Sequence, residues 1–255
     1  AIMTAKAENI NGVFEGKALI DIDAAAVRHY TDAPEWKKEQ NIFSKYQILF
    51  YPMVKLGERL FHLSTQAAGL MAKVDTDNGG CPCESASNKN LQVDSAVVDD
   101  GAAGGEILLD PQQANYLNSQ GIVTALNFMG SFVLWGNESA CFPASTDIKD
   151  YFYPVSRMFG WVSNTIVLTF WGKLDKRLNR RLIDNICDTM NIWLNGLTAE
   201  EKILGGRVEF REDENPDTSL MAGKATFHVF LTPCSPAKHL HFILEYSAEY
   251  LAALF

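Results

Sequence analysis

Residues 155–197, VSRMFGWVSNTIVLTFWGKLDKRLNRRLIDNICDTMNIWLNGL, decide the fold because they carry two apolar stripes at helical spacing. The first stripe consists of Val155, Met158, Phe159, Val162 and Ile166. The second consists of Leu174, Leu178, Leu182, Ile186, Met190 and Trp193, and Gly196 is typical of a helix end. We therefore predict two long helices, at residues 155–171 and 174–197, each burying one face.

The sequence on either side of these helices favours strands. Strands are predicted at residues 46–51, 122–128, 132–135, 207–210, 226–232 and 239–246, with Pro233 and Pro236 in the turn between the last two. Shorter helices are predicted at residues 66–74 and after Asp110-Pro111, a favourable N-cap pair. The fold class is therefore α/β (α+β), a mixed β-sheet that includes residues 46–51 and 226–232 and is flanked by long helices.

Composition excludes several classes of protein. The chain has 255 residues, a net charge of -9 and an isoelectric point near 5.0, which argues against a nucleic-acid partner. No apolar run approaches the roughly 20 residues that a membrane span needs, so we expect no membrane insertion. Five cysteines in a chain of this length do not indicate a disulfide framework, and synthesis in a reducing cytoplasm is expected. Because residue 1 is Ala, we expect a fragment or a processed product.

Nothing in the sequence predicts a metal site, a cofactor or a catalytic centre. Cys81 and Cys83 supply two thiols where a zinc site needs four ligands, so they are expected to be surface thiols in a loop. Residues 75–79 begin like a calcium loop, but Ala86 stands where the bidentate glutamate is required. His239 and His241, with His228 on a neighbouring strand, lack a further ligand. Residues 100–105 lack the phosphate-loop pattern, and no serine lies in a nucleophile elbow.

A basic run begins the second predicted helix. Its members are Lys173, Lys176, Arg177, Arg180 and Arg181. The first turns of a helix disfavour positive charge, so this placement calls for an anionic neighbour. Asp184 and Asp188 on the same face offer one, which leaves a solvated, self-paired face as one interpretation and a surface for a binding partner as the other.

A series of short motifs resembles the C-terminal domain of the contractile tail sheath family of phages, R-type bacteriocins and prophage-derived particles. The motifs are AGLMA at 68–72 with Asp75 and SNK at 87–89, NYLN at 115–118 with GIV at 121–123, FVLWGN at 132–137, YFYPVSRM at 151–158, LGG at 204–206 with EF at 209–210, TP at 232–233 and PA at 236–237. The chain departs from the family pattern at residues 136–139, GNES, and at Met158 after Arg157.

The resemblance implies residues 46–255 to be the sheath C-terminal domain and residues 1–45 a less certain N-terminal portion, a remnant of a preceding or inserted domain. It implies no enzyme and no cofactor, but a structural subunit that polymerises into a helical sleeve around a tail tube and contracts to drive the tube through a target cell envelope. Expected partners are other copies of the subunit, the tail tube protein, and the baseplate or tail terminator. The expected location is the tail of a virion or phage-like particle made in the host bacterial cytoplasm.

Two surfaces are candidates for these contacts. The basic run is expected to meet the tube or a neighbouring subunit. The last two predicted strands and the apolar tail are expected to link subunits, through Thr226, Val229, Leu231, His241, Ile243, Tyr246, Tyr250, Leu254 and Phe255. The alternatives are an α/β hydrolase or nucleotide-using enzyme, and a soluble binding module.

Overall fold

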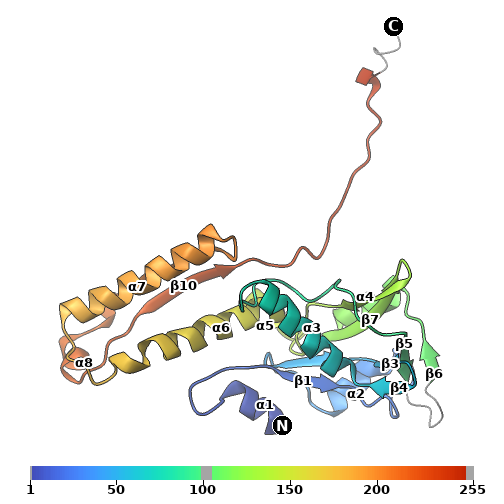
Figure 1. The fold of residues 1–255 in the computed structure, drawn as a ribbon, viewed down its shortest axis with the longest axis horizontal. Coiled ribbons are helices and arrows are strands. Elements are labelled where there is room, and N and C mark those ends of the chain that lie inside the picture. Colours follow the sequence, from blue (N-terminus) through green and yellow to red (C-terminus); the bar gives the residue numbers. More distant parts are fainter. Residues whose placement is uncertain (1, 99–104, 251–255) are drawn as a thin grey trace.

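The fold is built around a four-stranded sheet that is covered on both faces. The computed structural model describes residues 2–98 and 105–250 (Figure 1). The strand order is β1-β2-β7-β8, with β1, β2 and β7 parallel and β8 antiparallel to β7. The strands are β1 (Ala18–Asp21), β2 (Gln47–Phe50), β7 (Ile122–Phe128) and β8 (Ser131–Trp135). Ile48 and Phe50 face one core cluster whereas Leu49 faces another, so β2 is buried on both sides, as a parallel strand requires.

A second, antiparallel sheet and four helices pack around this sheet. The sheet order is β4-β3-β5-β6. Its strands are β3 (Met53–Leu56), β4 (Arg59–Phe61), β5 (Ser95–Val98) and β6 (Gly105–Ile107), and the helices are α1 (Ile2–Glu8), α2 (Ala33–Glu39), α3 (Leu63–Asp77) and α4 (Pro111–Ser119). Asp110 caps α4 as predicted, in a capping box with Gln113. We call residues 2–98 and 105–152, which end with α5 (Ile148–Tyr151), the body.

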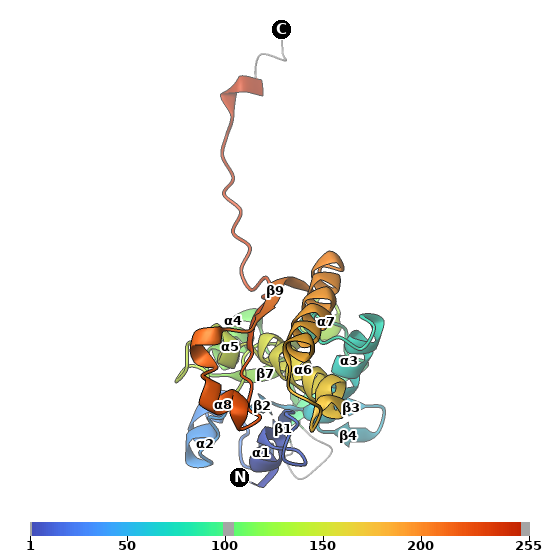
Figure 2. The same ribbon diagram turned by 90° about the vertical axis from the view of Figure 1, so that its left-hand side faces the viewer.

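The two long helices and a β-ribbon form a second layer, the blade, at residues 153–238. Its elements are α6 (Tyr153–Phe170), the 3-10 turn η1 (Trp171–Lys173), α7 (Arg180–Ala199), β9 (Ile203–Glu209), η2 (Glu212–Glu214), α8 (Asp217–Met221) and β10 (His228–Pro233). Figure 2 shows α6 and α7 beside the ribbon. Met158, Leu194 and Val208 belong to the blade's core cluster, in which helices and ribbon cover one another.

The predicted fold class is confirmed, but several details differ. Residues 46–51 and 226–232 were expected in one sheet, whereas β2 and β10 lie in separate sheets. The second helix begins at Arg180 rather than at Leu174, because Asp175 takes a positive φ of 60° and Asn179 caps α7 by accepting a hydrogen bond from Leu182. Residues 239–246 form no strand with β10, whose partner is β9.

Residues before Tyr46 contribute to the body's core. Strand β1 pairs in parallel with β2, and Ile22, Val27 and Ile42 are buried in the cluster that also holds Leu49. The origin of residues 1–45 in a preceding or inserted domain stays a prediction.

The body also holds one buried and one half-buried lysine without a carboxylate directly bonded to them. Lys37 is 2 % exposed and donates hydrogen bonds to the carbonyl oxygens of Gln120 and Phe142. Lys17 donates to Ser156 Oγ and to the Lys45 carbonyl oxygen. Burial lowers the pKa of each amine to about 8. The Lys37 amine therefore ties two backbone segments together inside the body, and the Lys17 amine joins the body to α6 of the blade.

Candidate functional site

The chain past the blade runs away from the rest of the molecule as an extended arm, residues 239–250 in the described part (Figure 1). Six large apolar side chains on it are between 73 % and 96 % exposed: Leu240, Phe242, Ile243, Leu244, Tyr246 and Tyr250. His241 lies on the arm and is also exposed. Apolar surface of this extent is unfavourable in water unless another surface covers it. Leu254 and Phe255 lie outside the described residues.

Of the two strands of the ribbon, β9 has its outer edge partly closed. β10 pairs with β9 antiparallel, with Val229 opposite Val208. The side chain of Asn191 on α7 accepts from the Val208 N–H at 2.8 Å and donates to the Val208 carbonyl oxygen at 3.1 Å. The backbone groups of Val208 therefore point away from β10 and are already satisfied, as a neighbouring strand would satisfy them.

The outer edge of β10 is open, as the geometry of the antiparallel pair with β9 shows. In an antiparallel pair, opposite residues alternate between exchanging both backbone hydrogen bonds and exchanging neither. Because Val208 directs its groups outward, Val229 opposite it does the same, and so does Leu231 two residues on. Within residues 2–98 and 105–250, no strand pairs with this edge. Val229 and Leu231 thus present a row of backbone donors and acceptors.

Thr226 does not belong to that edge. It precedes β10, and its backbone N–H and carbonyl oxygen are both bonded to the side chain of Asn215. Asn215 in turn is buried and bonds the Arg211 carbonyl oxygen. Thr226 therefore fixes the loop into β10 instead of offering groups to another chain.

The basic run surrounds the turn between α6 and α7. Lys173 ends η1, Lys176 and Arg177 lie in the turn, and α7 begins at Arg180, so the expected placement of Arg177 within the helix was wrong. Arg180 is paired with Asp184 at 3.0 Å and with Glu212 at 3.2 Å, as the self-paired interpretation predicts. Within the described chain, Lys173, Lys176, Arg177 and Arg181 form no ion pair.

The same turn exposes apolar side chains. Trp171 and Leu174 are each 61 % exposed, and Leu168 is 69 % exposed. We call Trp171, Lys173, Leu174, Lys176, Arg177 and Arg181 the blade tip. A mixed basic and apolar tip suits contact with an acidic protein surface that also offers apolar area.

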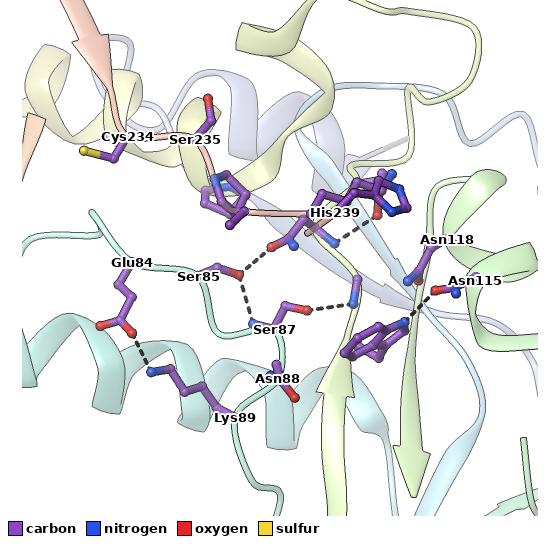
Figure 3. Close-up of a pocket in the computed structure, with 18 of the residues that line it drawn as sticks. Glu84, Ser85, Ser87, Asn88, Lys89, Asn115, Asn118, Cys234, Ser235 and His239 are labelled. Atoms are coloured by element: carbon purple, nitrogen blue, oxygen red, sulfur yellow. Dashed lines mark hydrogen bonds and ion pairs between the residues drawn. The ribbon is translucent and has the colours of Figure 1, made fainter. Parts of the chain in front are cut away.

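A polar pocket of about 530 Å³ lies between the body and the start of the arm (Figure 3). Its walls carry hydroxyl and amide groups that bond one another: Gly136 N–H donates to Ser87 Oγ at 3.1 Å, and Trp135 Nε1 donates to Asn115 Oδ1 at 2.9 Å. Ser85 Oγ bonds Asn137 Oδ1 in the same wall. These hydroxyls are bonded to amide oxygens and backbone groups, not to a histidine or carboxylate base, so the pocket lacks the arrangement of a nucleophilic active site.

The cysteines and histidines form no metal centre among the residues that the structure describes. Cys81 is not the surface thiol that the sequence predicted, because it is 1 % exposed and lies 3.7 Å from Met158 Sδ in the blade's core. Burial raises the pKa of the Cys81 thiol to about 12, which disfavours the thiolate that binds metals. His228 is bonded to Glu214, whereas His239 and His241 are on the arm. In the part of the chain described, no helix has the length and apolar character to cross a membrane.

Sequence comparison identifies relatives of known role. No protein-family model matches the chain. The chain is 32 % identical over 214 residues to the tail sheath protein of Burkholderia phage BcepMu, an alignment that covers 81 % of this chain and 44 % of that protein. It is 26 % identical over 193 residues to the tail sheath protein of Escherichia phage P2, covering 76 % of this chain and 46 % of the relative. The chain thus spans less than half the length of these curated relatives.

Solved structures share the fold. The contracted helical sheath of the anti-feeding prophage matches with a TM-score of 0.74 and 18 % identity, over 97 % of this chain and 65 % of that one. The contracted sheath complex of the extracellular contractile injection system PVC matches with a TM-score of 0.75 and 17 % identity, over 91 % and 64 %. At this identity the likeness shows the fold alone.

Proposed function

Because the chain belongs to the contractile tail sheath family, we propose that it is the C-terminal, tube-facing part of a subunit that polymerises into a helical sleeve around a tail tube. Contraction of the sleeve would drive the tube through a target cell envelope. The relatives are named as tail sheath proteins, which supports a structural role and gives no support to a hydrolase, a nucleotide-using enzyme or a soluble binding module.

The observation that carries the proposal is an arm and an open edge on the same chain. The arm presents an extended apolar segment, and β10 presents unpaired backbone groups. A strand added to such an edge satisfies both partners at once. The arm points away from the body, so it reaches another copy and not its own β10 (Figure 1). Head-to-tail links of this kind do not close, and they generate a helical polymer.

The blade tip supplies the second contact. Its four cations without an ion pair among the described residues, Lys173, Lys176, Arg177 and Arg181, favour an acidic surface on the tail tube protein or on a neighbouring subunit. Arg180 is already engaged by Asp184 and Glu212 and contributes less.

The relatives and the solved sheath assemblies support self-assembly in the tail of a virion or phage-like particle. The baseplate or tail terminator is the expected partner at the ends of the sleeve. The subunit would be synthesised in the host bacterial cytoplasm before it assembles.

A test of the arm uses the full-length subunit in a sheath-assembly assay with electron microscopy. Truncation after Ser247 should impair sheath formation, and the longer truncation after Lys238 should abolish it. Circular dichroism and thermal melting should stay unchanged, because the described part of the removed segment, residues 239–250, is exposed. Normal sheaths from both truncated proteins would contradict the arm's role.

A test of the edge compares two substitutions at one position. Val229→Pro removes an outward N–H that has no partner inside the ribbon, so the ribbon tolerates it while an arriving strand loses a donor. Val229→Ala keeps the N–H and serves as the control. We expect Val229→Pro alone to weaken assembly. Equal assembly of the two variants, both folded, would argue against strand addition at β10.

A test of the blade tip reverses charges. The double substitution Arg177→Glu and Arg181→Glu should weaken assembly on tubes, and the defect should depend on salt because the contact is electrostatic. The double substitution Arg59→Glu and Lys73→Glu, at exposed cations on β4 and α3 of the body, changes the net charge equally, so it is the matched control and should assemble normally. The same defect in both variants would show an effect of net charge and not of the tip.

A further inference from the structure

We propose that Lys238, through its ion pair with the buried carboxylate of Glu138, is the positioning residue that fixes where and in which direction the arm leaves the body. This inference rests on the proposed function, in which the arm links subunits. It adds a residue pair that holds the arm's starting point while the rest of the arm stays free to reach a neighbour.

The two residues come from distant parts of the chain. Glu138 follows β8, and its backbone bridges to Phe152 at the start of α6. Its side chain is 1 % exposed, and Lys238 Nζ bonds its Oε1. The other carboxylate oxygen, Oε2, accepts from the Asn137 N–H at 3.0 Å. The carboxylate is thus fixed within the body, and Lys238 brings the chain end to it.

A second contact restricts the lysine further. Lys238 Nζ lies 5.6 Å from the centre of the Phe142 ring, within the range of a cation–π interaction. Lys238 is therefore held by an anion on one side and an aromatic face on another. Two contacts from different loops of the body define the position of one amine.

Lys238 is the last point at which the chain end is held. Pro233 is buried, and Cys234 and Pro236 are half-buried. Cys234 Sγ lies 3.7 Å from the Glu201 carbonyl oxygen. From Ala237 to residue 250 every residue is exposed, and the Lys238 side chain is itself 37 % exposed. Among the described residues, the pair with Glu138 is therefore the last ion pair or hydrogen bond that holds the chain end.

The pair is strong because Glu138 has no substitute partner. Within the described chain, Lys238 is the cation paired with it. A carboxylate shielded from water is costly unless it is paired, so Glu138 retains Lys238 firmly. An arm that leaves from a fixed point in a fixed direction has a higher effective concentration at a neighbour's edge than an arm that pivots earlier.

If the Lys238–Glu138 ion pair is lost, the polar pocket leaves the chain end room to move. It is lined on one side by residues of the body, including Ser85 and Ser87, and on the other by residues 234–239 (Figure 3). Without the ion pair, these chain-end residues border open space and not a packed wall. Loss of Lys238 should therefore release the arm several residues earlier, near Cys234.

The test measures backbone order and assembly in parallel. In the 255-residue chain, 15N relaxation should give order parameters of about 0.8 up to residue 238 and below about 0.6 beyond residue 240. In Lys238→Met the fall should begin near Cys234. In the full-length subunit, Lys238→Met should reduce the rate of sheath formation by about tenfold, and Lys238→Arg should restore it, because arginine keeps the charge.

A double variant separates positioning from stability. Lys238→Met alone leaves a buried charge without a partner and should lower Tm. Glu138→Gln combined with Lys238→Met removes that charge and should recover Tm, yet the arm should stay released and assembly slow. If the double variant recovers both Tm and assembly, the pair acts on stability alone and the proposal is overturned.

The outcomes also separate this inference from the proposed function. Unchanged order at residues 234–238 and normal assembly in Lys238→Met would refute the positioning role, while a defect on truncation after Lys238 would still uphold the arm as a link. Normal assembly of the truncated protein would instead refute the link itself, whatever the relaxation data show.

Discussion

The body and the blade differ in how they treat the edges of their sheets. In the body, the outer edge of β8 is closed by residues 88–91: the Asn88 and Leu91 N–H groups donate to carbonyl oxygens of β8, and the Leu134 N–H donates to the Lys89 carbonyl oxygen. In the blade, a two-stranded ribbon has one edge partly closed by Asn191 and one edge open at β10. The body resembles a self-contained domain, whereas the blade and the arm expose the groups that another chain would satisfy.

This difference separates stability from association. Substitutions in the body should change the free energy of unfolding and leave the contact surfaces intact. Substitutions on the arm, the β10 edge or the blade tip should change assembly and leave unfolding nearly unaffected. Substitutions in each region, from the largest expected change in stability to the smallest, therefore test this division.

Gly121→Ala should cause the largest loss of folding stability. Gly121 has a φ of +70°, and an added Cβ would lie 2.6 Å from the Phe142 carbonyl oxygen and 2.7 Å from the Ser139 carbonyl oxygen. Backbone strain and overpacking together predict a loss of about 4 kcal/mol in urea unfolding. Gly130→Ala is the matched control, because Gly130 also has a positive φ but open space around it, and it should cost about 1 kcal/mol. Equal losses would show that the contact around Gly121 does not matter.

Raising the pH should stabilise the body. Lys17 and Lys37 have a pKa lowered to about 8 in the folded chain by burial, against 10.5 as the ordinary value. Between these values the unfolded chain binds more protons at these two amines, so their contribution to the free energy of unfolding rises with pH from about 8 to 10.5. Each lysine contributes at most about 3.5 kcal/mol, at about 1.4 kcal/mol per pKa unit. The buried Cys81 thiol, whose pKa is raised from 9.0 to about 12, acts in the opposite direction above about pH 9, so the net rise should be clearest between pH 8 and 9. Denaturant unfolding across this range measures the rise.

The control for this pH dependence is a variant that lacks the two lysine amines. The double variant with Lys17→Met and Lys37→Met should lose most of the slope between pH 8 and 10.5, although it will be less stable at every pH because carbonyl oxygens lose their donors. A slope that survives in this variant would assign the effect to other groups.

Arg157→Met should weaken the joint between body and blade by about 2 kcal/mol, since it leaves a partly buried carboxylate unpaired. Arg157 on α6 pairs with Asp75 on α3, and both side chains are largely shielded, at 18 % and 21 % exposed. The other Asp75 oxygen is buried without a hydrogen-bond partner in the described structure. Urea unfolding is followed by tryptophan fluorescence in a chain that also carries Trp36→Phe and Trp135→Phe. The remaining tryptophans then all lie in the blade, where Trp161 and Trp193 pack together. An unchanged transition would mean that this ion pair does not hold the blade.

Arg180→Ala should have the smallest effect on stability, with no resolvable change in Tm. Its ion pairs with Asp184 and Glu212 are exposed, and exposed pairs contribute little. The thermal melting curve should be superimposable on that of the unmodified chain. A clear fall in Tm would indicate that the start of α7 is part of a cooperative core.

Elements that depend on short-range interactions were predictable from local sequence patterns. Asp110 and Pro111 predicted the start of α4, and the apolar run at residues 46–51 predicted the buried strand β2. The helical stripes predicted α6 and most of α7. Leu174 and Leu178 continued the stripe by spacing alone, but the positive φ of Asp175 and the cap at Asn179 place them in a turn.

Features that depend on distant contacts were not predictable in the same way. Cys81 lies in a polar stretch of sequence and is buried only because α6 packs over it. Residues 239–246 have strand-like composition, but a strand needs a partner, and β10 is paired with β9. The Lys238–Glu138 pair and the Asn191 bond to Val208 leave no periodic signal, since they join residues brought together by folding.

Hydrogen–deuterium exchange on the free full-length subunit and on the assembled sheath tests the central claim most directly. The arm amides of residues 240–246 should exchange freely in the subunit. In the sheath, these amides and those of Val229 and Leu231 should become protected by about 100-fold or more, because added strands pair their backbone groups. Intact sheaths in which the arm amides still exchange at the free rate would contradict the claim that this arm links one subunit to the next.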